Sequence, residues 1–157
     1  MSNVCIIMPV YNHAATIGAV IDGALRYVSK VFVVNDGSTD DLPEVLQGFE
    51  GRISVISYPI NRGKGHALQC GFEAARKLGY DYALTLDADG QHRSEDIPLL
   101  LNAITQHPHS LVIGSRQLAH ENMPSKNTFA NRFSNFWFTV QTGKRLSDTQ
   151  TGFRIYP

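Results

Sequence analysis

Short apolar runs alternate with helical stretches along most of the chain. Each run holds four or five mostly apolar residues and is followed by turn-forming residues, which is typical of buried strands. Apolar residues spaced three and four apart in 66–78 are typical of a helix with one buried face. Ser94 is expected to be the N-cap of the helix that follows it, and Gly79 the C-terminal cap of the helix that precedes it. The pattern predicts strands at Val4–Met8, Val31–Val34, Ile53–Ile56, Tyr82–Leu86 and Leu111–Gly114, and helices at Ala15–Tyr27, Asp41–Gln47, His66–Leu78 and Ser94–Gln106.

The alternation of strands and helices determines the expected fold. Strands joined through helices pair in parallel by right-handed crossovers, and the helices cover both faces of the sheet. The apolar strands agree with burial between two helical layers. The sequence therefore predicts an α/β fold with a mostly parallel central sheet, and residues 1–157 fit one domain.

Two carboxylates follow the fourth strand. In extended backbone Asp87 and Asp89 would lie on one side of the chain, where they repel each other unless a cation lies between them. Oxygen ligands of this kind suit Mg²⁺ or Mn²⁺, and Gln91 could add a neutral oxygen. Asp-Ala-Asp-Gly is also a common way to make a turn, so the motif alone leaves both interpretations open.

The charge composition bears on two classes of binding partner, nucleic acid and anionic membranes. Lys+Arg 14 and Asp+Glu 14 leave no net charge, so there is no bulk electrostatic case for binding nucleic acid or an anionic membrane. The chain shows no signal peptide and no apolar run long enough to span a membrane. Cys5 and Cys70 have neither metal-binding spacing nor a nucleophile context. We expect reduced core thiols in a cytoplasmic protein.

Polar motifs follow every predicted strand. In open α/β sheets ligands bind at the carboxyl ends of the strands, so these motifs are expected to form one pocket. The glycine loop Asn61–Gly65 matches neither a Walker motif nor the dinucleotide fingerprint. It is either a left-handed turn before a helix or a phosphate contact at a helix N-terminus.

After the fifth predicted strand the chain no longer alternates between strands and helices. Aromatic residues between Phe129 and Val140 recur at helical spacing, which is more often core packing than membrane contact. The chain then ends at Pro157, close after the polar motif Asp148–Arg154. We expect a catalytic domain that is cut short at its C-terminus.

Four motifs occur in an order that resembles family 2 glycosyltransferases with the GT-A fold. They are Met8–Asn12, Val34–Asp40, Asn61–Gly65 and Asp87–Asp89. Gln91, Gly114–Arg116 and Asp148–Arg154 are further similar to the branch of dolichyl-phosphate mannose synthases and polyprenyl-phosphate sugar transferases. The resemblance implies an inverting, metal-dependent transferase of cell-envelope biogenesis. Its expected partners are a UDP- or GDP-sugar donor and a polyprenyl phosphate acceptor, with peripheral contact at the inner face of the membrane and no nucleic acid.

The resemblance also implies roles for individual residues. The expected donor-binding residues are Pro9, Tyr11, His13, Val34, Asp36, Lys64, Asp87, Ala88 and Arg116. Asp87, Asp89 and Gln91 would bind Mg²⁺ or Mn²⁺, Asp148 and Asp89 would be catalytic, and Arg154 would bind the acceptor. Without the resemblance, an Asx turn before Gly152 would be the better interpretation of Asp148.

The sequence departs from the family pattern at two positions, and three other functions remain as alternatives to the lipid-phosphate transferase. His13 stands where the family often has Glu, and Asn35 replaces the first of a common Asp pair. The acceptor could instead be a saccharide hydroxyl, or the chain could be a non-catalytic nucleotide-sugar binding module. A nucleotidyltransferase of the same fold class would carry a glycine-rich basic loop after the first strand, where this chain has Pro9–Asn12.

Overall fold

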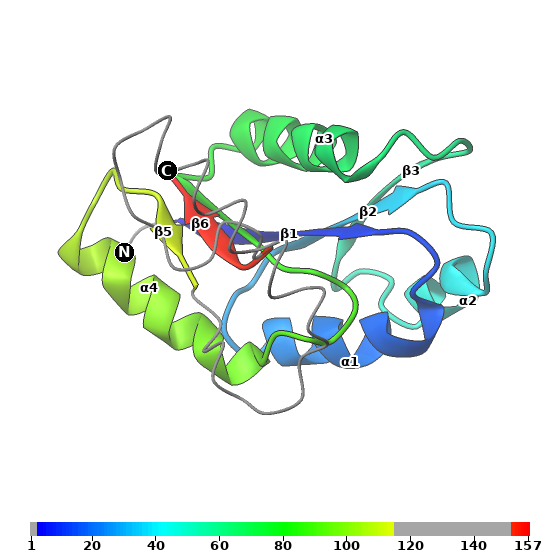
Figure 1. The fold of residues 1–157 in the computed structure, drawn as a ribbon, viewed down its shortest axis with the longest axis horizontal. Helices are drawn as coiled ribbons and strands as arrows, with labels where there is room; N and C mark the ends of the chain where they lie inside the picture. Colours follow the sequence, from blue (N-terminus) through cyan, green and yellow to red (C-terminus); the bar gives the residue numbers. More distant parts are fainter. Residues whose placement is uncertain (1–2, 115–151) are drawn as a thin grey trace, which may run out of the picture.

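A six-stranded mixed sheet forms the centre of the molecule (Figure 1). The computed structural model describes residues 3–114 and 152–157. The strands are β1 (Val4–Val10), β2 (Val31–Asp36), β3 (Ser54–Tyr58), β4 (Tyr82–Thr85), β5 (Val112–Ile113) and β6 (Arg154–Tyr156). The helices are α1 (Ala14–Ala24), α2 (Leu42–Gln47), α3 (Lys64–Lys77) and α4 (Ile97–Gln106), with a 3-10 turn η1 (Ser94–Asp96) before α4. All the predicted strands and helices in this part of the chain are present.

The strand order is β3-β2-β1-β4-β6-β5. The pairs β2–β3, β1–β2 and β1–β4 are parallel, whereas β6 is antiparallel to both β4 and β5. The expectation of a mostly parallel sheet is confirmed. The sheet is mixed rather than wholly parallel, because β6 lies between β4 and β5. Three residues are too short to show a strand period, so the sequence pattern did not reveal β6.

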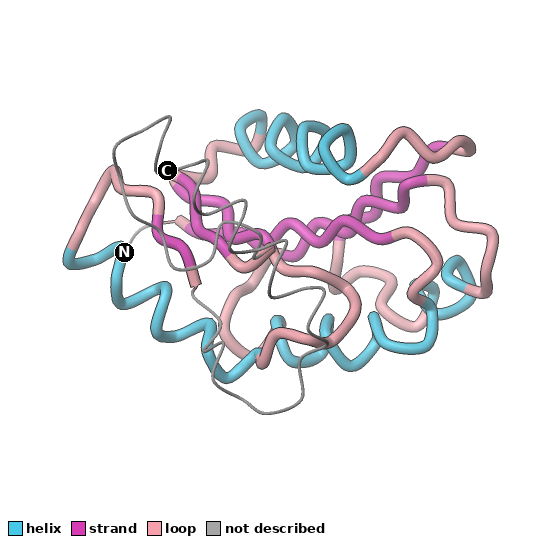
Figure 2. Tube along the Cα trace, in the orientation of Figure 1, coloured by secondary structure: helices cyan, strands magenta, loops and turns pink. Residues whose placement is uncertain are grey.

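Helices cover both faces of the sheet, as expected. Figure 1 and Figure 2 show α3 on one face and α1, α2 and α4 on the other. Strand β1 alternates between the two cores: Ile6 and Met8 pack with the α1 side, and Cys5 and Ile7 with the α3 side. Because both faces are buried, β1 reads as a continuous apolar run rather than as an alternating one.

Helix α3 packs very close to β1. A Cβ atom placed on Gly71 would collide with the side chain of Ile7, which is fully buried. The helix ends at Lys77, and Gly79 follows the C-cap residue Leu78 with φ 74°. The amides of Gly79 and Tyr80 donate to the carbonyls of Arg76 and Ala75, so the predicted glycine cap is confirmed as a Schellman motif.

The start of α4 differs from the prediction. Ser94 is not an N-cap: it begins the 3-10 turn η1, and α4 begins at Ile97 without a side-chain cap. The Ser94 side chain instead packs against Gly23 of α1, where a Cβ would collide with it. Packing between α1 and η1 therefore takes Ser94 away from its expected local role.

Both cysteines are free thiols. Cys5 is fully buried in β1, and this burial raises the pKa of its thiol to about 12. Cys70 is half-buried in α3, with its sulfur 3.7 Å from Nε2 of His66. Cys5 is therefore an inert core residue, as expected.

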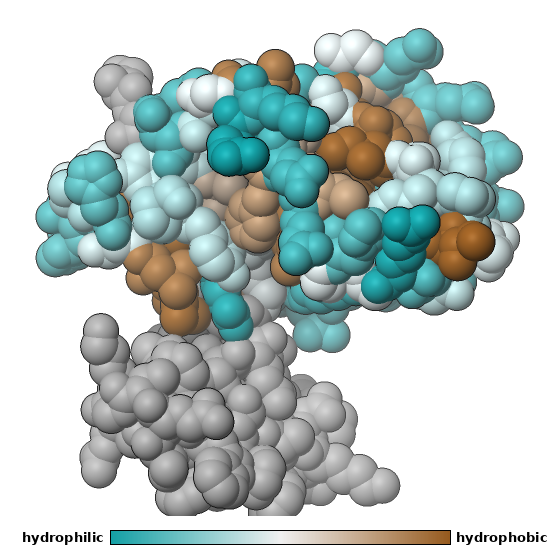
Figure 3. All heavy atoms as spheres, turned by 90° about the horizontal axis from the view of Figure 1, so that it is seen from above, coloured by the Kyte–Doolittle hydropathy of each residue, from teal (hydrophilic) through white to brown (hydrophobic). Residues whose placement is uncertain are grey.

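The surface over α3 is mostly hydrophilic. On the face that carries α3, hydrophobic side chains form small separate patches in a mostly hydrophilic surface (Figure 3). Within residues 3–114 and 152–157, no helix combines the length and the apolar character needed to cross a bilayer.

The close packing at Gly71 gives a stability prediction. We expect Gly71→Ala to lower the free energy of unfolding by about 1–3 kcal/mol, because the new methyl group must displace buried Ile7. The matched control is Gly18→Ala in α1, where a Cβ would make only ordinary contacts of 3.8 Å. Its better helix propensity should leave stability unchanged or raise it by up to about 1 kcal/mol. Urea denaturation of both variants tests this, and equal effects would contradict it.

Candidate functional site

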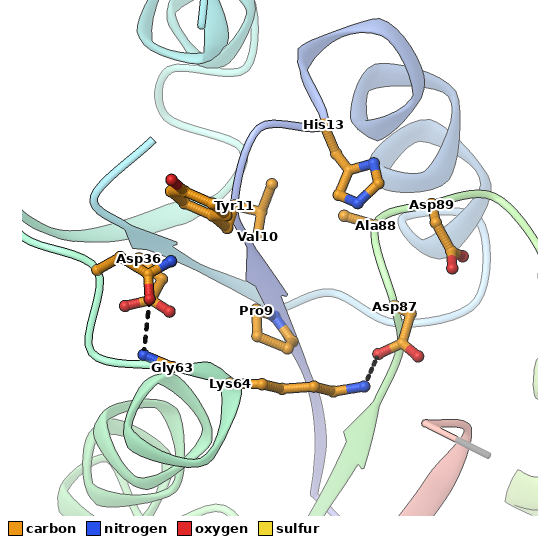
Figure 4. Close-up of a pocket in the computed structure, with 11 residues that line it drawn as sticks. Pro9, Val10, Tyr11, His13, Asp36, Gly63, Lys64, Asp87, Ala88 and Asp89 are labelled. Atoms are coloured by element: carbon orange, nitrogen blue, oxygen red, sulfur yellow. Dashed lines mark hydrogen bonds and ion pairs between the residues drawn. The ribbon is translucent and has the colours of Figure 1, made fainter. Parts of the chain in front are cut away.

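A pocket of about 360 Å³ opens where β1, β2 and β4 end. The chain leaves β1 toward β2 on one side and returns to β4 on the other, so this is a topological switch point of the sheet. Figure 4 shows the side chains that converge here from these strand ends and from the first turn of α3. The lining residues are Pro9, Val10, Tyr11, His13, Asp36, Asn61, Gly63, Lys64, Asp87, Ala88 and Asp89.

The two acids after β4 lie in a turn. β4 ends at Thr85, and residues 88–89 form a turn that Gly90 continues with φ 75°. The expectation of extended backbone from Asp87 to Asp89 is therefore wrong. Both carboxylates nevertheless border the same pocket. Asp89 accepts a hydrogen bond from the amide of Gln91 at 2.9 Å, which is the Asx turn weighed as the alternative.

Neighbouring elements hold this turn in place. The amide of Leu86 donates to the carbonyl of Ile7 at 3.0 Å, which extends the β1–β4 ladder by one residue. The hydroxyl of Thr16 in α1 donates to the carbonyl of Ala88 at 2.7 Å. The turn is thus fixed between the sheet and α1, and its acids cannot leave the pocket without breaking these bonds.

Lys64 is the cation of the pocket. It is the first residue of α3 and follows Gly63, whose φ of 89° turns the chain into the helix. Its Nζ lies 2.6 Å from Oδ1 of Asp87 (Figure 4). The Lys64 side chain is 53% exposed, so this ion pair is worth at most about 1 kcal/mol. A ligand with stronger charge could displace it.

Asp36 lies at the opposite end of the pocket. It ends β2, is 3% exposed, and accepts a hydrogen bond from the amide of Arg62 at 2.7 Å. Burial, followed by the neighbouring Asp36 carboxylate, raises the pKa of the Tyr58 hydroxyl above its ordinary value. Tyr11, which is 45% exposed, stands at the rim. This end offers a buried acceptor beside an exposed aromatic ring.

The loops after β1 and β2 are tied together. The side-chain oxygen of Asn12 accepts a hydrogen bond from the backbone amide of Thr39 at 2.8 Å. The backbone amide of Asn12 donates to the hydroxyl of Ser38 at 3.0 Å. Asp40 accepts a hydrogen bond from the amide of Ala14 at 2.8 Å and so caps α1 from another loop. The motif after β2 therefore supplies a helix cap to α1.

The structure brings most of the predicted site residues together. Pro9, Tyr11, His13, Asp36, Lys64, Asp87, Ala88 and Asp89 all line the pocket. Val34 is fully buried in β2, and neither Gln91 nor Arg154 lines the pocket. Arg116 and Asp148 lie outside the described residues.

The acids of the turn fit a hard divalent ion that keeps an open coordination sphere. In the described ranges, no group of three His, Cys, Asp or Glu residues could cage a metal. Mg²⁺ and Mn²⁺ do not need such a cage, because one or two carboxylates, waters and substrate phosphates can complete their shell. Asp87 and Asp89 would hold such an ion at the mouth of the pocket.

Three residues that contribute to the site were not predicted from the sequence. Thr16 holds the acid turn, Asn61 lines the pocket, and Gly152 packs against Asp87. Asn61 and Gly152 lie within motifs that the sequence did single out. No sequence pattern pointed to Thr16, because a threonine inside an amphipathic helix is common and its contact with Ala88 exists only in the folded chain.

Comparisons with protein families and with known proteins point to one family. The model of the family described as glycosyl transferase family 2 matches residues 5–156. The chain is 28% identical over 170 residues to the UDP-N-acetylglucosamine–dolichyl-phosphate N-acetylglucosaminyltransferase of Methanococcus voltae, covering 96% of the chain and 68% of that protein. It is 30% identical over 159 residues to the undecaprenyl-phosphate mannosyltransferase of Micrococcus luteus, covering 96% of the chain and 64% of that protein.

Solved structures share the fold at lower identity. Glucosyl-3-phosphoglycerate synthase from Mycobacterium tuberculosis, in complex with Mn²⁺, UDP-glucose and phosphoglyceric acid, superposes with a TM-score of 0.77 at 20% identity. The match covers 99% of this chain and 56% of that one. The sheet is therefore of the GT-A type. The chain spans only about half to two thirds of the length of the proteins it matches.

The ion pair in the pocket gives a prediction about metal binding. We expect Lys64→Gln to tighten Mn²⁺ binding about two- to fivefold in the absence of nucleotide, because Asp87 loses a competing cation. The same variant should bind a nucleoside diphosphate more weakly, because the pocket loses a cation that could pair with the phosphates. Calorimetric titrations with Mn²⁺ and with UDP measure both effects.

Lys77→Gln is the matched control, since Lys77 lies at the other end of α3. It should change neither affinity. Unchanged or weaker Mn²⁺ binding by Lys64→Gln would show that Lys64 does not compete for Asp87.

Proposed function

The chain belongs to glycosyl transferase family 2, and we propose that it transfers a sugar from a nucleotide-diphosphate sugar to a polyprenyl phosphate with inversion. One observation carries the donor half of this proposal. The pocket at the switch point places a buried acceptor, Asp36, at one end and an acid turn with a lysine at the other. A nucleoside diphosphate has matching chemistry, with a hydrogen-bonding base at one end and a diphosphate at the other.

The nucleoside would occupy the Asp36 end. The carboxylate of Asp36 can accept a hydrogen bond from the base, and Tyr11 offers a ring at the rim. Pro9 forms the floor between the two ends, and Val34 supports it from within the sheet. UDP-glucose is the donor bound in the glucosyl-3-phosphoglycerate synthase complex. We propose a UDP- or GDP-sugar for this chain.

The diphosphate would occupy the acid-turn end. Helices α1 and α3 both begin at the pocket, with His13 and Gly63 as their N-cap residues. Helix N-termini favour anions. Lys64 supplies a mobile cation, and His13 stands in the position where the family often has Glu. Asn35, the second departure, accepts a hydrogen bond from the amide of Ser38 at 2.9 Å and so retains a structural role.

The reaction follows from these placements. Asp87 and Asp89 would hold Mg²⁺ or Mn²⁺, which when bound neutralises the charge on the leaving diphosphate. Lys64 can turn from Asp87 to the phosphates and assist the same charge. The acceptor oxygen must then approach the anomeric carbon in line from the opposite face, which inverts the configuration there. Asp148 and Arg154 would position that acceptor.

The acceptor half of the proposal depends on relatives. The Methanococcus and Micrococcus proteins are named for dolichyl phosphate and undecaprenyl phosphate. A phosphate oxygen already carries charge at neutral pH, so a lipid phosphate needs orientation more than a base. A lipid acceptor would bring this domain to the inner face of the membrane, in cell-envelope biogenesis. The alternatives are a saccharide hydroxyl acceptor and a non-catalytic donor-binding module.

The metal site gives a direct prediction. We expect Asp89→Asn to weaken UDP binding in Mn²⁺ at least tenfold and to make it as weak as wild-type binding in chelator. Asp22→Asn is the control, because Asp22 is an exposed carboxylate paired with Arg52 away from the pocket. Calorimetry with and without chelator provides the comparison. Tight, chelator-resistant binding of UDP by Asp89→Asn would refute the metal site.

The acceptor class can be decided with Asp148 and Arg154. For a lipid phosphate, Asp148→Asn should leave the basic limb of the pH profile unchanged, and Arg154→Ala should be the more damaging variant. For a hydroxyl acceptor the order reverses, since a missing general base typically costs about 10²- to 10⁴-fold. The measurement is kcat/KM against pH for both variants in the full-length protein. A loss near 10³-fold for Asp148→Asn beside a mild Arg154→Ala would exclude the lipid phosphate.

A further inference from the structure

We propose that Thr85 and Gly152 are positioning residues that hold the Asp87 carboxylate at the mouth of the pocket. The inference rests on the proposed function, because it takes Asp87 to be a metal ligand. It concerns residues from distant parts of the chain: Thr85 ends β4, and Gly152 lies two residues before the start of β6. We call this pair the Thr85–Gly152 clasp.

The hydroxyl of Thr85 joins the two halves of the clasp. Thr85 is 3% exposed, and its hydroxyl donates to the carbonyl of Gly152 at 2.6 Å. The carbonyl of Arg154, its partner in the antiparallel β4–β6 register, is farther away at 3.4 Å. A buried hydroxyl without a partner is costly, so the bond to Gly152 fixes where this residue can lie.

Gly152 lies directly against the carboxylate of Asp87. A Cβ atom built on Gly152 would collide with the carboxyl carbon and both oxygens of Asp87. The φ of Gly152 lies outside the left-handed region, so space rather than backbone conformation requires glycine here. Any larger residue at this position must push the Asp87 carboxylate away or move out of the clasp.

The segment that follows Gly152 cannot easily move. Phe153 is 4% exposed, and its ring stacks on His92 with the ring centroids 5.3 Å apart. Its carbonyl accepts a hydrogen bond from the amide of Gly114 at 2.9 Å, and Ile155 is fully buried. Gly152 is therefore held by the residues on its C-terminal side as well as by Thr85.

Two contacts confine the Asp87 carboxylate. Gly152 leaves no room for a side chain beside it, and Nζ of Lys64 lies 2.6 Å from Oδ1. Groups that orient a ligand carboxylate are worth about 10- to 100-fold in metal affinity in known sites. The clasp also joins the proposed metal ligand to the strand that carries Arg154, the proposed acceptor-binding residue.

Three variants of the full chain test the clasp. Gly152→Ala should weaken Mn²⁺ binding about tenfold or more, and Thr85→Val, which keeps the shape but removes the donor, about three- to tenfold. Thr85→Ser, which keeps the hydroxyl, should bind Mn²⁺ like the wild type. Gly18→Ala is the glycine control, because its Cβ has room. Mn²⁺ titration followed by electron paramagnetic resonance measures the affinities, and thermal unfolding shows that each variant is folded.

A double-mutant comparison separates positioning from general damage. In an Asp87→Asn background, Gly152→Ala should cause no further loss of Mn²⁺ affinity, because the ligand that it displaces is already absent. UDP binding in chelator should be the same in Thr85→Val and wild type. If one variant fails to fold, the remaining variant and Thr85→Ser still decide the question.

The outcomes separate this inference from the function on which it rests. Wild-type Mn²⁺ affinity in folded Gly152→Ala and Thr85→Val would overturn the clasp and leave the proposed function intact. A wild-type protein that binds no Mn²⁺, with or without UDP, would overturn the metal site and the clasp with it. Loss of affinity in both variants with recovery in Thr85→Ser would support the clasp.

Discussion

The placement of two carboxylates at the end of β4, on the border of one pocket, is the constraint around which the candidate site is built. Asp87 and Asp89 border the same pocket, and carboxylates that share one site favour a cation there. In the described structure Lys64 reaches Asp87 from the start of α3, while Thr16 and the β1–β4 ladder hold the turn. These hydrogen bonds hold the backbone that carries both acids at the strand end. That arrangement suits a divalent ion shared with a diphosphate.

The sheet explains why the acid turn and Asp36 border the same pocket. Apolar runs buried on both faces make β1, β2 and β4 parallel neighbours, so their carboxyl ends share one edge. The switch point there leaves a hollow between Asp36 and the acid turn. Glucosyl-3-phosphoglycerate synthase, solved with UDP-glucose and Mn²⁺, shares this fold. The proposed donor site thus follows from the strand order, and the proposed acceptor depends on the segment around β6.

Much of this could be predicted from the sequence, because the strands and the pocket depend on local pattern. Apolar runs ended by turn residues gave the strands, and motifs such as Asp87–Asp89 lie where strand ends converge. The failures share a physical cause, which is contact between distant segments. β6 is only three residues long, Ser94 packs on Gly23 instead of capping α4, and the acids follow a turn instead of extended backbone. The hydrogen bonds from Thr16 to Ala88 and from Thr85 to Gly152 exist only after folding.

The central claim is that this pocket uses a divalent ion to deliver a nucleotide-linked sugar to a lipid phosphate. The most direct test incubates the full-length protein with radiolabelled UDP- and GDP-sugars and undecaprenyl phosphate, with Mn²⁺ or with chelator, and follows label into the lipid phase. The account predicts a lipid-linked sugar with inverted anomeric configuration that forms with Mn²⁺ and not in chelator. Equal transfer in chelator, or transfer to a saccharide hydroxyl with none to the lipid phosphate, would contradict it.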